Sequence, residues 1–158
     1  MTSISGAVLP GHFDLGSIGA GLVFADSLPQ LQRSLAEHRA AVVQAPPGTG
    51  KTTLVPPAVA NLLHQVSDRQ GPTTAPSPSR VIVTQPRRVA ARAAASRLAH
   101  LHGRALGGDV GYSVRGERRT GKDTLVEFLT PGVLVNRLLA DPELSLSLIH
   151  ISEPTNRG

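Results

Sequence analysis

The sequence predicts an α/β protein in which a parallel sheet is flanked by helices. Short apolar runs of strand length alternate with longer stretches of helical periodicity, which is typical of strand–helix–strand units. A glycine-rich turn at residues 45–53 also lies between the first apolar run and a long helical stretch. With 158 residues, the chain is long enough for one domain with its own core.

The first half of the chain predicts a tail, a short helix and a strand. Residues 1–26 are glycine-rich without a clear period, so we expect a flexible N-terminal tail. Ser27, followed three residues later by Gln30, resembles a capping box and predicts a helix that runs to about His38. The apolar run 40–44 predicts a strand that is buried on both faces.

The rest of the chain continues the alternation of helices and strands. Polar residues and prolines dominate 65–79, so we expect a disordered loop there. Thr130 is a favourable N-cap and Pro131 a favourable first residue of a helix. Helices are predicted at 54–64, 86–102 and 133–140, and strands at 80–85, 109–115 and 124–130.

The turn at 45–53 has the composition of a phosphate-binding loop. Gly48 and Gly50 allow the backbone to turn its N–H groups inward around a phosphate. Lys51 supplies a positive charge, and the hydroxyl of Thr52 can hold Mg²⁺. The predicted nucleotide site comprises Pro47, Gly48, Thr49, Gly50, Lys51, Thr52 and Thr53. The alternative is a proline–glycine turn with no ligand.

A second stretch, residues 116–123, shares part of this pattern. It contains two glycines followed by Lys122, but Asp123 stands where the metal-binding hydroxyl should be. A strand-like run follows it instead of a helix. We therefore interpret this stretch as a charged turn.

The charge of the chain favours an anionic partner. The net charge is +5 and the calculated pI is about 11.0, with 14 Arg and 2 Lys. Residues 80–104 hold six Arg and no Asp or Glu. Nucleic acid is the usual partner of such a surface, and the alternative is a solvated basic helix face. No apolar run reaches the length of a membrane span, and the chain has no Cys.

Four stretches in order resemble the DEAH-box ATP-dependent helicases, and most closely the bacterial HrpB type. These stretches are Ala45–Thr53, Thr84–Ala91, Val110–Glu117 and Phe128–Leu134. The resemblance implies a P-loop NTPase fold in which residues 27–144 form part of a RecA-like domain. It also implies ATP and Mg²⁺ as cofactors and a nucleic acid as partner, with RNA favoured over DNA, and we expect a cytoplasmic protein. The nucleic-acid-binding residues that it implies are Gln85, Pro86, Arg87, Arg88, Arg115, Thr130, Pro131 and Gly132.

The chain departs from the family after residues 141–144. The family continues into a strand that ends in Asp-Glu-x-His, and no such run follows here. We therefore expect residues 145–158 to be a non-native tail, and the chain to be an N-terminal fragment without catalytic residues of its own. Such a fragment would bind ATP without appreciable hydrolysis. Two alternatives remain: a small self-contained P-loop nucleotide-binding protein or kinase, and a basic, non-enzymatic nucleic-acid-binding fragment.

Overall fold

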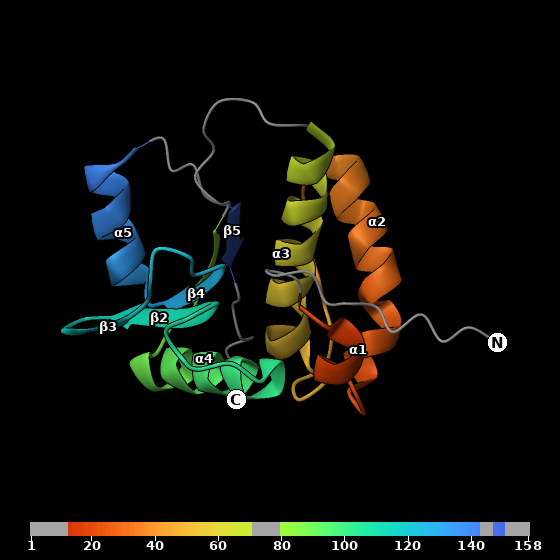
Figure 1. The fold of residues 1–158 in the computed structure, drawn as a ribbon, viewed down its shortest axis with the longest axis horizontal. Helices are drawn as coiled ribbons and strands as arrows, with labels where there is room; N and C mark the ends of the chain where they lie inside the picture. Colours follow the sequence, from red (N-terminus) through yellow and green to blue (C-terminus); the bar gives the residue numbers. More distant parts are fainter. Residues whose placement is uncertain (1–12, 71–79, 143–146, 151–158) are drawn as a thin grey trace, which may run out of the picture.

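A computed structural model describes residues 13–70, 80–142 and 147–150, and shows helices packed around a five-stranded sheet (Figure 1). The helices are α1 (Leu15–Ile18), the 3₁₀ helix η1 (Val23–Ser27), α2 (Leu28–His38), α3 (Lys51–Gln70), α4 (Arg88–His102) and α5 (Pro131–Ala140). The strands are β1 (Val81–Thr84), β2 (Val110–Val114), β3 (Glu117–Arg119), β4 (Val126–Leu129) and β5 (Ser147–His150).

The sheet has the order β3-β2-β4-β1-β5. Strands β2, β4, β1 and β5 are parallel to their neighbours, and β3 pairs antiparallel with β2. The α/β fold predicted from the sequence is therefore confirmed. Three of the predicted strands are present as β1, β2 and β4, and the helix expected at 86–102 is α4.

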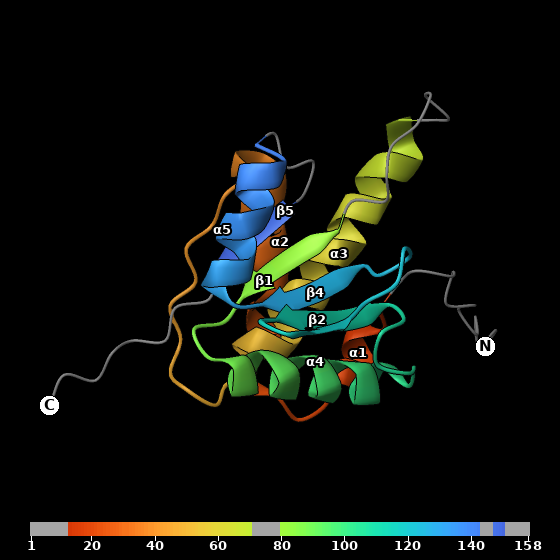
Figure 2. The same ribbon diagram turned by 90° about the vertical axis from the view of Figure 1, so that its left-hand side faces the viewer.

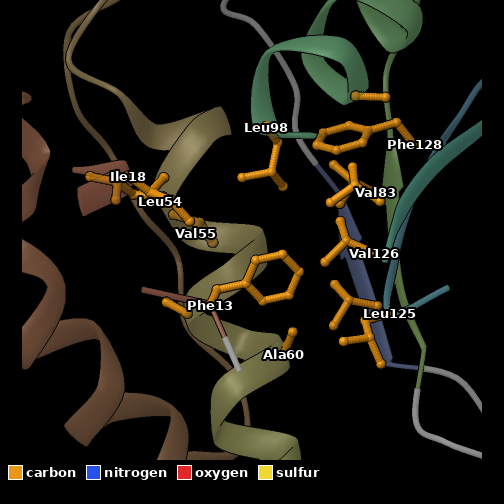
Figure 3. Close-up of a cluster of buried hydrophobic side chains, with 14 of the residues drawn as sticks. Phe13, Ile18, Leu54, Val55, Ala60, Val83, Leu98, Leu125, Val126 and Phe128 are labelled. Atoms are coloured by element: carbon orange, nitrogen blue, oxygen red, sulfur yellow. The ribbon is translucent and has the colours of Figure 1, made fainter. Parts of the chain in front are cut away.

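Helices cover both faces of the sheet. Helices α3 and α4 pack on one face, and α5 lies on the other (Figures 1 and 2). Along β4 the buried side chains alternate: Val126 and Phe128 belong to the core, whereas Glu127 contacts Arg137 of α5. Figure 3 shows Val126 and Phe128 on the side of the sheet that faces Leu98 and α3. The main core therefore lies between the sheet and α3 and α4.

The prediction of a flexible N-terminal tail is wrong for residues 13–26, which fold against α3. Phe13, Ile18 and Phe24 are buried. The backbone N–H of Phe13 donates to the Asn61 side chain, and the Asn61 amide donates back to the Phe13 carbonyl, both at 2.8 Å. The elements here are only four and five residues long, so no helical period could be read from the sequence. Residues 1–12 lie outside the described residues.

The prediction of a strand at residues 40–44 is also wrong. These residues form no strand, and Val42 is fully exposed. Both edges of β1 are already occupied, by β4 and β5. Residues 41–45 instead line a small pocket together with η1 and α2.

Two smaller differences concern the ends of elements. The Ser27 side chain makes no capping bond, because η1 runs into α2 and the Ser27 backbone is already helical. Helix α3 continues to Gln70, so the first part of the loop expected at 65–79 is helical. Residues 71–79 lie outside the described residues.

None of the helices in the described part of the chain is long and apolar enough to cross a membrane.

The segment expected to be a non-native tail is described in part. Residues 147–150 form β5, which pairs with β1 in parallel register. The other residues of 145–158 lie outside the described ranges. The hypothesis that this segment is foreign to the fold therefore stays a prediction.

Candidate nucleotide and nucleic-acid sites

The glycine-rich turn leads directly into α3. Gly48 and Gly50 have φ angles of 78° and 98°, in the region that favours glycine. Helix α3 begins at Lys51, so the positive end of its dipole faces the turn. The strand expected before the turn is missing, whereas a helix follows the turn as predicted, with bounds Lys51–Gln70 in place of 54–64.

Five consecutive backbone N–H groups of this turn are free to bind a ligand. Within the described residues, the N–H groups of residues 48–52 donate to no backbone or side-chain acceptor. The first intrahelical bonds come later, from Thr53 and Leu54 to the Gly50 carbonyl at 3.2 and 2.9 Å. Such a run of unpaired N–H groups at a helix start binds anions.

Two side chains of the turn donate hydrogen bonds to backbone carbonyl groups at its start. The Lys51 ammonium donates to the Ala45 carbonyl at 2.6 Å, and the Thr49 hydroxyl donates to the Pro46 carbonyl at 2.9 Å. No carboxylate in the described part of the chain forms an ion pair with Lys51. None of the carboxylates in the described ranges therefore neutralises its positive charge.

The second glycine–lysine stretch has a different structure. Residues 117–119 form β3, so part of what we predicted to be a turn is a strand. Gly116, with φ 82°, begins the return of the chain from β2 to β3. Lys122 is exposed and is followed by β4, not by a helix. No helix dipole supports an anion at this place.

A groove of about 1400 Å³ brings together seven of the eight predicted nucleic-acid-binding residues. They are Pro86, Arg87, Arg88, Arg115, Thr130, Pro131 and Gly132. Gln85 is the exception: it is buried, and its N–H extends the pairing of β1 by donating to the Leu129 carbonyl at 2.8 Å.

The topology of the sheet explains why the groove forms. Strands β1, β4 and β2 are parallel neighbours, so the segments that leave their carboxyl ends meet at one edge. Helices α4 and α5 both begin at this edge (Figure 2). The N-cap positions are Arg87 and Thr130, and neither side chain makes a capping hydrogen bond.

The groove also contains residues that sequence reasoning missed. They are Val114, Gly116, Val133, Val135 and Asn136. Val135 and Asn136 are three and four residues after Gly132, which places them on the same face of α5. Helical spacing from the predicted turn could have identified both.

Seven of the 14 arginines of the chain fall into two groups. Carboxylates hold four of them: Arg80 and Arg137 contact Glu127, Arg92 contacts Glu117 at 2.5 Å, and Arg104 lies 3.6 Å from Asp109. In contrast, the side chains of Arg87, Arg88 and Arg115 make no hydrogen bond or ion pair within the described residues. Acidic residues of other elements thus neutralise part of the basic segment 80–104, and the groove arginines remain available.

Glu127 is the centre of a buried polar network beneath α5. Its carboxylate accepts bonds from Arg137 at 2.5 and 2.7 Å, from Arg80 at 3.0 Å and from the Ser113 hydroxyl at 2.5 Å. Burial alone would raise the pKa of Glu127, but the bonds from Arg137 and Ser113 and the positive charge of Arg137 lower it overall. The bond to Glu127 in turn raises the pKa of Arg137.

Glu117 joins β3 to α4 and β2. It accepts a short hydrogen bond from the Tyr112 hydroxyl in addition to its ion pair with Arg92. The bond from Tyr112 is the main cause of a lowered pKa for Glu117, and the same bond raises the pKa of Tyr112. Arg92 is therefore engaged by Glu117 within the fold. It differs in this from Arg88, which lies four residues earlier on α4.

Sequence comparison finds relatives of this chain among the ATP-dependent RNA helicases. A DExH-box ATP-dependent RNA helicase of Arabidopsis thaliana, DExH1, is 33% identical over 149 residues, which cover 90% of this chain and 14% of the relative. A probable ATP-dependent RNA helicase of Caenorhabditis elegans, a DHX35 homologue, is 38% identical over 122 residues, or 77% of this chain and 15% of the relative. The chain is homologous to the DExH-box helicases.

A third helicase relative agrees with this assignment. The Arabidopsis helicase DExH3 is 36% identical over 129 residues, which cover 81% of this chain and 10% of the relative. The comparisons support the DEAH-box family, and the chain spans about one-seventh of the length of the first two relatives. No model of a protein family matches the chain.

Proposed function

We propose that this chain is the ATP-binding and RNA-binding part of an ATP-dependent RNA helicase of the bacterial HrpB type. The observation that carries the proposal is the groove, which gathers Arg87, Arg88, Arg115 and the start of α5 from three separate motifs. The relatives' names support ATP and RNA as ligands. The chain covers 10–15% of those relatives, so unwinding by a longer parent protein is part of the proposal.

The nucleotide would bind at the turn before α3. The free N–H groups of residues 48–52 and the unneutralised charge of Lys51 fit the outer phosphates of ATP. The Thr52 hydroxyl, which has no partner within the described residues, would be a ligand of Mg²⁺. Bound Mg²⁺ offsets the negative charge of the phosphates.

Nucleic acid would bind in the groove through its phosphates. The unpaired guanidinium groups of Arg87, Arg88 and Arg115 and the N–H groups at the start of α5 carry charge but no base information. We therefore propose binding of single-stranded RNA without sequence preference. Only one aromatic residue, Tyr112, lies in β2, and its hydroxyl is engaged by Glu117, which argues against base stacking as the main contribution.

Hydrolysis needs an acidic residue beside the phosphates. No Asp-Glu-x-His run occurs in the 158 residues. We therefore propose that the chain binds ATP without appreciable turnover. The homologues favour this helicase assignment over a self-contained kinase, and the free N–H groups before α3 favour it over a purely basic RNA binder. The cytoplasmic location expected from the sequence stays a prediction.

The salt dependence of RNA binding tests the groove. Wild type should bind a single-stranded RNA oligonucleotide with a Kd of roughly 10⁻⁴–10⁻⁶ M, the range of non-specific binding. The Arg87→Ala/Arg88→Ala variant should bind all sequences more weakly. Its slope of log K against log salt should be smaller by about 1.4, since each lost phosphate contact removes about 0.7. Fluorescence anisotropy at several salt concentrations measures both quantities.

The matched control removes two arginines from outside the groove. Arg33 and Arg97 are exposed and, within the described residues, have no ion-pair partner. The Arg33→Ala/Arg97→Ala variant loses the same charge and should keep most of the affinity. Equal weakening in the two double variants would mean that only net charge attracts RNA, and the groove assignment would be wrong.

A further inference from the structure

The N-terminal segment 22–27 contacts the phosphate-binding turn. Two of its residues meet the turn directly: the backbone N–H of Phe24 donates to the Thr49 carbonyl at 2.9 Å, and Leu22 packs against Gly50. The packing is close, because a Cβ atom built on Gly50 would lie 2.9 Å from Leu22 Cδ1. We call Leu22 and Phe24 the brace.

The bond from Phe24 fixes the orientation of one peptide group in the turn. In a planar trans peptide, the carbonyl of one residue and the N–H of the next point in opposite directions. Because the Thr49 carbonyl is held toward Phe24, the N–H of Gly50 must point away from the brace. That N–H is one of the five that have no acceptor within the described residues.

The brace is itself fixed to the core. Phe24 is 5% exposed, and Leu22 packs against the hydrophobic core cluster. The residues just before this segment are also packed: Phe13 and Ile18 are buried, and the two bonds between Phe13 and Asn61 tie this part of the chain to α3. The brace is therefore joined to α3, the same helix that begins with Lys51.

We propose that the brace is a part of the nucleotide site, and that Leu22 is a positioning residue for phosphate binding. The Leu22 side chain would not itself contact the nucleotide. It keeps Gly50 in its left-handed conformation, with φ 98°, and thereby keeps the Gly50 N–H aimed at the phosphate. This inference rests on the proposed nucleotide site and adds a dependence on residues that precede it by more than twenty positions.

Leu22→Ala tests the brace. The variant should bind Mg·ATP about tenfold more weakly, as expected for the loss of one charge-assisted N–H bond to phosphate. Because the brace acts on the phosphate turn, inorganic pyrophosphate should lose affinity by a similar factor. Leu22→Met keeps a side chain of similar volume and should restore binding. Isothermal titration calorimetry measures all of these affinities.

Two controls separate positioning from a general effect on the fold. Val23 is 72% exposed and next to the brace, and Val23→Ala should bind Mg·ATP like wild type. The Leu22→Ala variant should keep its affinity for single-stranded RNA, since the groove lies at the start of α4 and α5. Equal loss of RNA and nucleotide binding would mean that Leu22 supports only the fold, and would overturn the inference.

The inference and the proposed function can fail separately. If wild type and Lys51→Ala bind Mg·ATP equally, the proposed nucleotide site is wrong and the brace has no role in it. If Lys51→Ala abolishes binding while Leu22→Ala binds like wild type, the nucleotide site stands and the brace inference is wrong.

Discussion

Three arginines of the groove have no acidic partner within the described residues, whereas carboxylates hold four other arginines. This difference assigns the roles of single residues. Arg92 is bound by Glu117 and stabilises the fold, whereas Arg88, one helical turn earlier, is available to a ligand. The sequence could predict the basic segment. It could not predict which cations are neutralised, since Arg80 and its partner Glu127 are 47 residues apart.

The lowered pKa of Glu127 predicts loss of stability in acid. Its folded pKa lies below the ordinary value of 4.5, so the unfolded state binds the proton more readily. The contribution of Glu127 is therefore complete above about pH 4.5. It is lost as the pH falls below that value toward the folded pKa.

Glu127→Gln should remove this contribution. At pH 7 the variant should be less stable by roughly 3 kcal/mol, because Arg80 and Arg137 lose their charged partner. Between pH 5 and pH 3 its melting temperature should change less than that of wild type. Circular dichroism melts at these pH values measure both effects. Glu117→Gln is the control, since Glu117 is partly exposed, and its effect should be smaller. Identical acid sensitivity of wild type and Glu127→Gln would contradict the network.

Helix α5 illustrates how an element depends on contacts that its own sequence does not show. None of its residues is buried, and Val135, Leu138 and Leu139 are exposed. Its Arg137 reaches under the helix to Glu127 and to the Ser113 hydroxyl. Arg137 therefore ties α5 to β4 and β2 through this buried network.

Arg137→Ala should loosen the start of α5 without altering the phosphate-binding turn. The affinity for single-stranded RNA should fall about two- to fivefold, the value of a helix N-terminus beside a phosphate. Affinity for Mg·ATP should not change. Leu139→Ala, at a residue that is 78% exposed, is the control on the same helix and should bind RNA like wild type. An unchanged RNA affinity in Arg137→Ala would show that α5 is held by other contacts.

Elements with a strong local pattern were predicted correctly, and elements that depend on distant partners were not. The runs that became β1, β2 and β4 and the helix α4 have clear periodicity. The short helices of residues 13–27 have none, because they are held by tertiary contacts such as the pair of bonds between Phe13 and Asn61. Residues 40–44 show the opposite case: an apolar run that lies outside the sheet because β4 and β5 pair with both edges of β1.

At the scale of the whole molecule, the two sites are built from different parts of the chain. The phosphate-binding turn is local in sequence, and every residue predicted for it lies in the turn or in the first turn of α3. The groove is non-local: the resemblance to the DEAH-box helicases implied its principal residues, and the parallel strands bring them to one edge of the sheet. The brace was missed because its contacts with Thr49 and Gly50 leave no motif in the sequence.

Calorimetric titration of Mg·ATP tests the central claim most directly, because the chain contains two glycine–lysine stretches and two candidate sites. Wild type should bind weakly, and Lys51→Ala should lose roughly 10- to 100-fold in affinity with the loss of a charged hydrogen bond. Lys122→Ala and Arg87→Ala/Arg88→Ala should bind like wild type, since neither site contributes to the turn before α3. Equal affinity in wild type and Lys51→Ala, or a loss confined to Lys122→Ala, would contradict the account.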